Sequence, residues 1–572
     1  MPAGATHRQY EALRAFFLDK LPSQEAATKF GYTPGSFRVL CHQFRQNPQR
    51  PFFLPDRDAA RRAPQPSALT AQASRLQEKV IALRKQNCSI YDIVRSLRQE
   101  KQNLSPPAVW TILHQAGFAK LPRRRDDERP VGPYPAPAPV ADVRQLDWTP
   151  RQWRTEFGGL FLFVPLLVEL NLERLVRRVG LPGTPMIPAG CALRSLLGLK
   201  LFGSARHSHV MASGFDEGLA LFAGLNAIPK RSLLTEYSCR IEPACYPRLR
   251  QHGFDALSGL GLPRGVCFHL DFHTLPFPGE EALVEKHYVS KRSRRQKGIL
   301  AFLAQDAEQR VFCYANAALR KEEQNDEILR FVQFWKKRTG RLPEELIFDS
   351  KLTTYANLDA LNRQDIRFIT LRRRSEKLLA QMAKRPESAW RRIELKNVMR
   401  AYRTPRIIDQ RIRLDDYEGQ LRQITITDLG HEEPTLLLTN QLHRGAVDLI
   451  GHYAQRMLIE NSISDGVDFF HMDALSSAVA LKVNCDLQLT LLGSSLYRML
   501  GARIGGLYAT AESRHLFRDF VQASARVNLT DQVVQVQFGK RAHNPLRLSA
   551  GFAKTEVAVP WWGGRRLQLS FG

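Results

Sequence analysis

An acidic residue inside an otherwise apolar, strand-like run constrains this chain more than any other feature. Asp271 lies in the run Val266 to Thr274, where apolar and polar residues alternate. A period of two puts Asp271 on the same strand face as His269 and His273. Because burying an ionised carboxylate without a partner costs several kcal/mol, a metal ion or catalytic chemistry is the first hypothesis. The alternative is an edge strand with one solvated face.

The chain also carries a large excess of positive charge. Its 572 residues have a formal net charge of +27, spread over the sequence instead of forming one tail. This excess indicates a polyanionic partner, with nucleic acid ahead of a membrane surface. An apolar fraction of 44% supports several domains with their own hydrophobic cores.

Membrane and secretory signals are weak in this sequence. The longest uncharged apolar run, 157–168, is too short to span a bilayer, and the N-terminus lacks the apolar core of a signal peptide. The eight cysteines are scattered singly, which suggests neither a zinc knuckle nor a disulfide framework. We therefore expect a cytoplasmic location without membrane association.

Two basic helical units are expected before the central part of the chain. In the first, 1–60, Ser23 is expected to cap a helix, Gly31 supplies a turn, and Thr33-Pro34 begins a second helix. This pattern resembles a helix-turn-helix, whose second helix enters the major groove, although a helical hairpin without DNA function is the alternative. The expected exposed readers are Ser36, Arg38, His42 and Arg45.

A second helix-turn-helix unit is expected in 67–118. Helices begin there after Ser89 and at Ser105-Pro106, each with the residue types of a helix start. A Pro- and Arg-rich linker follows at 119–145, extended and semi-rigid because of its prolines. The next region, 146–255, has helical spacing and is predicted to be an all-helical subdomain.

An α/β core with a ribonuclease-H-like arrangement is predicted for 262–502. The strand with Asp271 is followed by two more strands, a helix, and a strand that ends at Asp349. Three antiparallel strands, a helix and a further strand form the beginning of such a core. A β-rich insertion is expected at about 376–445, and 503–572 is expected to be a strand-rich C-terminal region.

A third carboxylate comes from a helix that begins at Ala446. Tyr453, Arg456 and Glu460 are spaced to share one face of that helix. Arg suits a bidentate grip on phosphate, and Tyr donates to another phosphate oxygen or stacks on a base. The alternative third acids, which are out of phase with this pair, are Asp465, Asp468 and Asp473.

With these residues, the chain resembles the DDE transposases of bacterial insertion sequences, in the group with a β-strand insertion between the second Asp and the Glu. The family motif Tyr-x2-Arg-x3-Glu-x6-Lys matches Tyr453, Arg456 and Glu460 and departs at its last position, Val467. The resemblance covers about 265 to 500, including the Leu-Leu-Thr-Asn run that ends at 440.

The resemblance implies cut-and-paste DNA transposition, with metal-dependent cleavage at transposon ends followed by strand transfer into target DNA. Asp271, Asp349 and Glu460 would be the catalytic residues and would hold two Mg²⁺ ions, with Mn²⁺ as a substitute. Like charges about 4 Å apart repel by roughly 4 kcal/mol at an effective dielectric of 20, so such a cluster needs cations. The implied partners are double-stranded DNA and a second copy of the chain, in the bacterial cytoplasm and at the nucleoid.

Two other functions are compatible with these motifs. One is a transposase-derived protein that binds DNA without cleaving it, and the other is an unrelated nuclease with the same core. His269 and His273 are not expected to bind Mg²⁺, which prefers oxygen ligands. Trp390, in the insertion, is either a core residue or a platform for a flipped base. The residues expected to contact DNA are Tyr453, Arg456, Arg38, Arg45, Lys291, Arg292, Arg294 and Arg295, with Arg372 to Arg374 as a further basic cluster.

Overall fold

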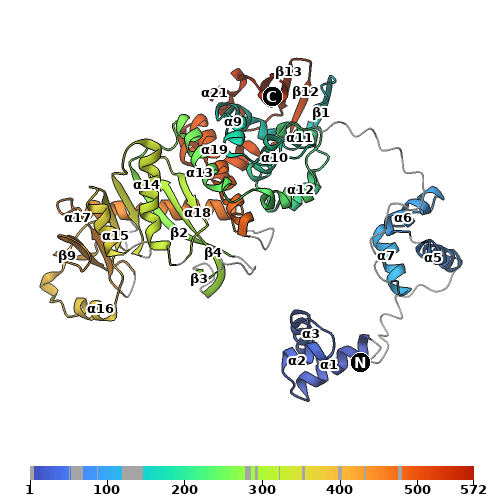
Figure 1. Cartoon of the computed structure of the whole chain (residues 1–572), viewed down its shortest axis with the longest axis horizontal. Coiled ribbons are helices and arrows are strands. Elements are labelled where there is room, and N and C mark those ends of the chain that lie inside the picture. The colour runs from blue at the N-terminus through green and yellow to red at the C-terminus, as the bar shows by residue number, and fades with distance from the viewer. Residues whose placement is uncertain are drawn as a thin grey trace. The chain divides into compact units, whose positions relative to one another are not determined.

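The computed structural model divides into two compact units, Met1–Pro137 and Ala138–Gly572 (Figure 1). The expected linker at 119–145, together with Lys291 and Arg292, lies outside the described residues. The structure describes residues 5–49, 52, 69–86, 88–118, 146–276, 285–289, 294–320, 322–350, 354–396, 402–430, 433–473 and 480–572.

The first unit contains two sets of three helices, each with its own apolar core. Thr33 caps α3 and Ser105 caps α7, each followed by the early proline that the sequence predicted. The expectation that Ser23 caps α2 is wrong, because Pro22 occupies the cap position and Ser23 is the first helical residue. The helices are α1 (Ala5–Phe17), α2 (Ser23–Lys29), α3 (Pro34–Gln46), α5 (Leu69–Lys85), α6 (Ile90–Gln99) and α7 (Pro106–Gln115).

A mixed sheet in the second unit has the strand order β3-β4-β2-β6-β7-β11-β10-β9-β8, with β5 also paired to β4. Strand β4 is antiparallel to β2, β3 and β5, whereas β6 is parallel to β2 and β7 is parallel to β6. The strands are β2 (Cys267–Pro276), β3 (Glu285–Val289), β4 (Arg294–Asp306), β5 (Val311–Asn316), β6 (Glu345–Phe348), β7 (Arg367–Leu371), β8 (Arg391–Arg392), β9 (Arg406–Ile412), β10 (Leu421–Thr427) and β11 (Thr435–Thr439).

Helices pack on both faces of this sheet, so that it has a core on each side. Phe268 and Leu270 of β2 face Phe331 and Trp335 of α14. On the opposite face, Leu275 packs with residues of α18 and α19, and other strands pack with α17. These helices are α14 (Glu327–Thr339), α15 (Tyr355–Asn362), α16 (Glu376–Ala383), α17 (Ala446–Ala454), α18 (Met457–Asp468) and α19 (Ala480–Ile504).

The strands of the predicted insertion continue the main sheet. Strand β11 pairs antiparallel with β7, with Leu437 opposite Leu371, and β10, β9 and β8 follow outward. The expected inserted β-subdomain is therefore part of one continuous sheet. An exposed edge at β7 would leave unpaired backbone groups, and β11 satisfies them.

The regions 146–255 and 503–572 share one hydrophobic core. The first is not all-helical as predicted: it begins with β1 (Arg151–Thr155), which pairs with β12 (Ala525–Leu529). The five-stranded sheet that results has the order β1-β12-β13-β15-β14. Its remaining strands are β13 (Val533–Phe538), β14 (Glu556–Ala558) and β15 (Arg566–Phe571), and the helices of this body are α8 (Val164–Glu169), α9 (Leu172–Val179), α10 (Ala189–Leu201), α11 (Glu217–Ala223), α12 (Arg231–Glu236), α13 (Cys245–Gly259), α20 (Ser513–Leu516) and α21 (Asn544–Ser549).

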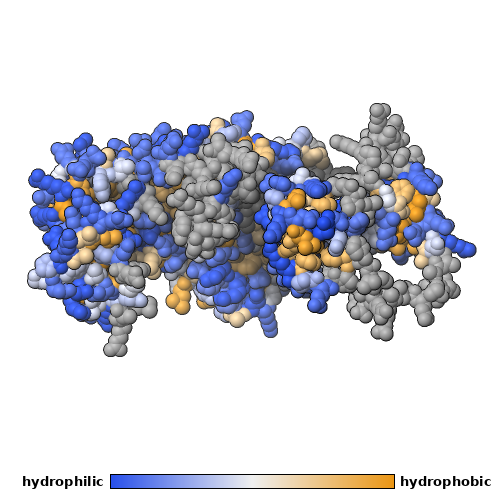
Figure 2. All heavy atoms as spheres, turned by 90° about the horizontal axis from the view of Figure 1, so that it is seen from below, coloured by the Kyte–Doolittle hydropathy of each residue, from blue (hydrophilic) through white to orange (hydrophobic). Residues whose placement is uncertain are grey.

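The face of the molecule in Figure 2 is mostly hydrophilic where it is coloured, with apolar side chains in smaller groups between polar ones. Within the described ranges, no helix combines the length and apolarity required to cross a membrane.

Candidate active site

Strand β2 presents Asp271 on the face covered by α17, α18 and α19. Its neighbours Leu270 and Phe272 point the other way, toward the core under α14, because side chains alternate along a strand. The Asp271 side chain is 19% exposed, and its Oδ1 accepts a hydrogen bond of 2.8 Å from the backbone N–H of Phe272. Asp271 is therefore largely desolvated but accessible from one side.

Asp349 lies beside Asp271 because β6 is the parallel neighbour of β2. The ladder between these strands ends with Leu270 opposite Phe348, so the two aspartates occupy the next position on each chain. Adjacent strands are about 4.8 Å apart, so Asp349, directly after β6, lies beside the middle of β2, where Asp271 is. Oδ1 of Asp349 accepts a 2.6 Å hydrogen bond from the N–H of Ser350, which fixes its orientation.

Arg456 connects Asp271 with the third predicted carboxylate, Glu460. Its Nη1 donates to Oδ2 of Asp271 at 3.1 Å, and its Nη2 donates to Oε1 of Glu460. The guanidinium carbon also lies 5.9 Å from the centre of the Tyr453 ring. Tyr453, Arg456 and Glu460 thus converge near Asp271, and Glu460 is half exposed.

The expected single helix through these residues is wrong. Helix α17 ends at Ala454 and α18 begins at Met457, with Arg456 at the N-cap position of α18. Because Gln455 and Arg456 form a turn between the two helices, spacing on one ideal helix does not by itself describe how Tyr453 and Arg456 approach each other. The contact between Arg456 and Glu460 is nevertheless made, since both belong to the start of α18.

The electrostatics of this site favour binding of a cation. Burial raises the pKa of Asp271 to about 6 despite the opposing effect of Arg456, and Glu460 and Asp349 add to the rise. Burial also raises the pKa of Tyr453 to about 12, which keeps its phenol a hydrogen-bond donor at neutral pH. The oxygen-rich set Asp271, Asp349 and Glu460 fits Mg²⁺ or Mn²⁺, and Arg456 supplies the positive charge between two of them in this structure.

The alternative third acids have other surroundings. Asp465 accepts a hydrogen bond of 3.1 Å from the N–H of Ser513, and burial raises its pKa. Asp468 is exposed and accepts a hydrogen bond from Ser464. Val467, where the family motif has Lys, is buried in the core between the sheet and α19. An apolar residue suits that buried position.

Most of the predicted basic and aromatic residues make hydrogen bonds, ion pairs or ring contacts with nearby residues. Arg38 and Arg45 are exposed on α3, with Arg45 stacked 5.5 Å from the Phe17 ring. In the cluster from Arg372 to Arg374, each arginine bonds to a nearby residue, the respective partners being Gln423, Ser350 and Glu433. Trp390 is partly exposed beneath Arg406, and the side chains of Arg294 and Arg295 lie outside what the structure describes.

His269 is fully buried on the same strand face, between Cys267 and Asp271. Within the part of the chain that the structure describes, neither of its ring nitrogens has a hydrogen-bond partner, and burial, together with the charges of His452 and Arg456, lowers its pKa to about 4. It is therefore a neutral imidazole and not a bonded partner of Asp271.

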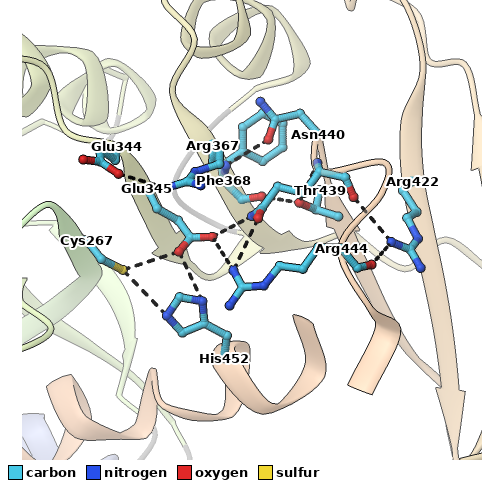
Figure 3. Close-up of polar contacts among 11 residues, drawn as sticks. Cys267, Glu344, Glu345, Arg367, Phe368, Arg422, Thr439, Asn440, Arg444 and His452 are labelled. Carbon is cyan, nitrogen blue, oxygen red and sulfur yellow. Dashed lines mark hydrogen bonds and ion pairs between the residues drawn. The ribbon is translucent and has the colours of Figure 1, made fainter. Parts of the chain in front are cut away.

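Sequence reasoning missed a second polar cluster on this face, formed by Cys267, Glu345 and His452 (Figure 3). Burial, with Glu345 adding to it, raises the pKa of the Cys267 thiol to about 12. Burial also lowers the pKa of His452, against the effect of Glu345. One signal in the sequence was Glu345 itself, a charged residue at the start of a strand that is otherwise apolar.

Comparisons with known proteins give little further guidance. No family model matches the chain, and no curated protein is similar to it. Among solved structures, the chain is similar to piggyBac transposase in a synaptic complex with hairpin DNA, with 10% identity and a TM-score of 0.37 over 64% of this chain and 80% of that one. A TM-score of this size is too low to establish a shared fold.

Proposed function

We propose that the protein is a DNA transposase with a ribonuclease-H-like core, which cleaves DNA at transposon ends and transfers the strands into target DNA. The observation that carries this proposal is that Arg456 pairs with both Asp271 and Glu460, while Asp349 directly follows β6, the strand next to that of Asp271. The strand order β5-β4-β2-β6-β7, with three antiparallel strands followed by two parallel ones, supports the assignment of the core.

In this proposal, the three carboxylates hold two Mg²⁺ ions. When bound, a pair of ions roughly 4 Å apart activates the attacking oxygen and stabilises the leaving oxygen of an in-line phosphoryl transfer. Asp271 and Asp349 are positioned by neighbouring strands, so their spacing is set by the sheet. Glu460 is on a helix end and half exposed, which lets it adjust as DNA and ions enter.

Arg456 and Tyr453 are suited to handle the DNA backbone beside the carboxylates. If bound cations held Asp271 and Glu460, the Arg456 guanidinium would be available to bind a phosphate. Tyr453, which stays protonated, donates to a second phosphate oxygen. Both residues therefore bind and orient the substrate in this scheme.

Recognition of the element ends is assigned to the first unit. Helix α3 exposes Arg38 and Arg45 near the position from which a helix-turn-helix reads the major groove. The net charge of +27 supports binding to double-stranded DNA. Joining two DNA ends requires at least a homodimer in the active complex.

The decisive experiment is a nicking and joining assay with DNA from the flanks of the gene, in the presence and absence of Mg²⁺. We expect Mg²⁺-dependent nicks and joined products with the wild type, none with Asp271→Asn, and normal activity with Asp468→Asn, a matched change on the same helix as Glu460. DNA binding without any nick would favour the transposase-derived DNA-binding protein. Nicking without joining would favour an unrelated nuclease.

A further inference from the structure

The second cluster on the face of β2 joins three elements of the core. Cys267 begins β2, Glu345 begins β6 directly opposite it in the ladder, and His452 is on α17. Oε2 of Glu345 lies 3.8 Å from Sγ of Cys267 and 3.1 Å from Nδ1 of His452. Sγ of Cys267 lies 4.0 Å from Nε2 of His452, and Figure 3 shows the three side chains pointing toward one another.

The separations of Oε2 of Glu345 from Nδ1 of His452 and from Sγ of Cys267 are close to those around a tetrahedral zinc ion. Zinc binds sulfur at about 2.3 Å and nitrogen or oxygen at about 2.0 to 2.2 Å, so its tetrahedral ligands lie roughly 3.3 to 3.6 Å from one another. One ligand atom from each of the three residues falls within 4.8 Å of the others. Rotation of the His452 ring and side-chain shifts of up to roughly 1 Å therefore close the geometry around one ion.

The surroundings of Glu345 orient it as a ligand. Its Oε1 accepts a 2.6 Å hydrogen bond from Nε2 of Gln441 and pairs with Nη1 of Arg444 at 3.2 Å. Both contacts are on one oxygen, which turns Oε2 toward Cys267 and His452. Among the described residues, Nδ1 of His452 has no hydrogen-bond partner of good geometry, although it lies 3.1 Å from Oε2 of Glu345. Outer contacts of this kind orient metal ligands.

We propose that Cys267, Glu345 and His452 bind a Zn²⁺ ion that fastens α17 to strands β2 and β6. A thiolate, an imidazole and a carboxylate together select zinc over the hard cation Mg²⁺. Cys267 and Asp271 are separated along the same strand by about 13 Å at 3.3 Å per residue, so this site is distinct from the carboxylates of the proposed active site. The inference does not depend on the proposed function.

The test measures metal in the full-length protein purified in reducing buffer without a chelator. Elemental analysis is expected to find close to one zinc per chain, and metal-free protein titrated with Co²⁺ is expected to show a thiolate-to-cobalt charge-transfer band. Cys267→Ser and His452→Asn should weaken zinc binding by more than about 100-fold, since even changes around the ligands cost 10- to 100-fold. Gln441→Ala, which loosens Glu345, should fall within that smaller range.

Two controls separate loss of the site from loss of the fold. Cys239→Ser replaces an exposed cysteine and should keep both the zinc and the cobalt band. Asp271→Asn should also keep them, because it lies outside the cluster. Circular dichroism of Cys267→Ser is the check that this variant remains folded. Wild-type protein without zinc and without a cobalt band, or folded Cys267→Ser with both unchanged, would overturn the proposal.

Discussion

Two clusters of ligand-type side chains lie on the same face of β2, and they differ in both chemistry and access. The cluster at Asp271 consists of carboxylates compensated by Arg456, and it opens to solvent at the half-exposed Glu460. The cluster at Cys267 has one sulfur, one nitrogen and one oxygen donor, and its Glu345 side chain is only 5% exposed. The cluster at Asp271 is therefore suited to exchange ions and substrate with solvent, and the cluster at Cys267 is suited to retain a bound ion.

This difference shows how one strand can serve two purposes. The period of two places Cys267, His269 and Asp271 in a row on one face. What each residue does is then decided by the partners that β6, α17 and α18 bring to it. Glu345 belongs to β6 and Asp349 directly follows it, so both clusters depend on the parallel pairing of β2 with β6.

The largest expected effect comes from Asp349→Asn, which should break only the first cluster. Loss of a metal-holding carboxylate is expected to slow Mg²⁺-dependent nicking by at least about 1,000-fold. Zinc content should stay at the wild-type level, because Asp349 does not contact Cys267, Glu345 or His452. Single-turnover nicking and elemental analysis of the same preparation measure both. A simultaneous loss of zinc would show that the two clusters are not separate.

Removal of zinc should affect only the second cluster, and it should do so by lowering the thermal stability of the protein. An ion present at 100 times its dissociation constant stabilises the folded state by about 2.7 kcal/mol. A zinc-selective chelator should therefore lower the thermal unfolding midpoint of the wild type and leave that of Cys267→Ser unchanged. Differential scanning calorimetry with excess Mg²⁺ present distinguishes zinc removal from general chelation. Equal shifts in both proteins would count against the zinc site.

The residues around Asp271 also show what a sequence can predict. Alternation identified the face of the strand, and the strand that ends at Asp349 was recognised from its apolar run. The register that sets these two aspartates side by side agrees with both patterns. Local spacing could not predict the break between α17 and α18, because Tyr453 to Glu460 contains no proline or glycine to signal it.

Contacts between distant segments escaped the sequence for a different reason. Strand β1 pairs with β12, and Glu345 meets His452, across long stretches of chain. Periodicity describes one segment at a time, so neither pairing has a local signature. The same limit explains why 146–255 was expected to be entirely helical, and why Cys267 was considered only as one of eight scattered cysteines.

The stability of the metal-free protein should depend on pH because of Asp271. Its pKa is about 6 in the folded protein, against an ordinary value of 3.8. The folded state therefore holds the proton more tightly, and stability falls as the pH rises from about 4 to about 6. The full cost above that range is about 2 to 3 kcal/mol. In metal-free protein, Asp271→Asn should remove this cost.

Denaturant unfolding with a chelator at about pH 4 and about pH 7.5, chosen to bracket that range, measures the effect. The variant should gain stability over the wild type at the higher pH and little at the lower one. Added Mg²⁺ should stabilise the wild type and reduce the difference. Parallel pH profiles for the two proteins would contradict the desolvated state of Asp271.

The smallest expected effect concerns His269, which lies between the two clusters. Its ring nitrogens are buried without hydrogen-bond partners, a condition that costs about 1 kcal/mol or more. His269→Met replaces the imidazole with an apolar side chain of similar length and should raise the stability of the metal-free protein by about that amount. The affinities for zinc and for Mg²⁺ should change by less than about threefold, or less than 1 kcal/mol. A larger loss of zinc affinity would show that His269 is a fourth zinc ligand. A larger loss of Mg²⁺ affinity would show that His269 supports Asp271. Either result would show that the two clusters are not independent.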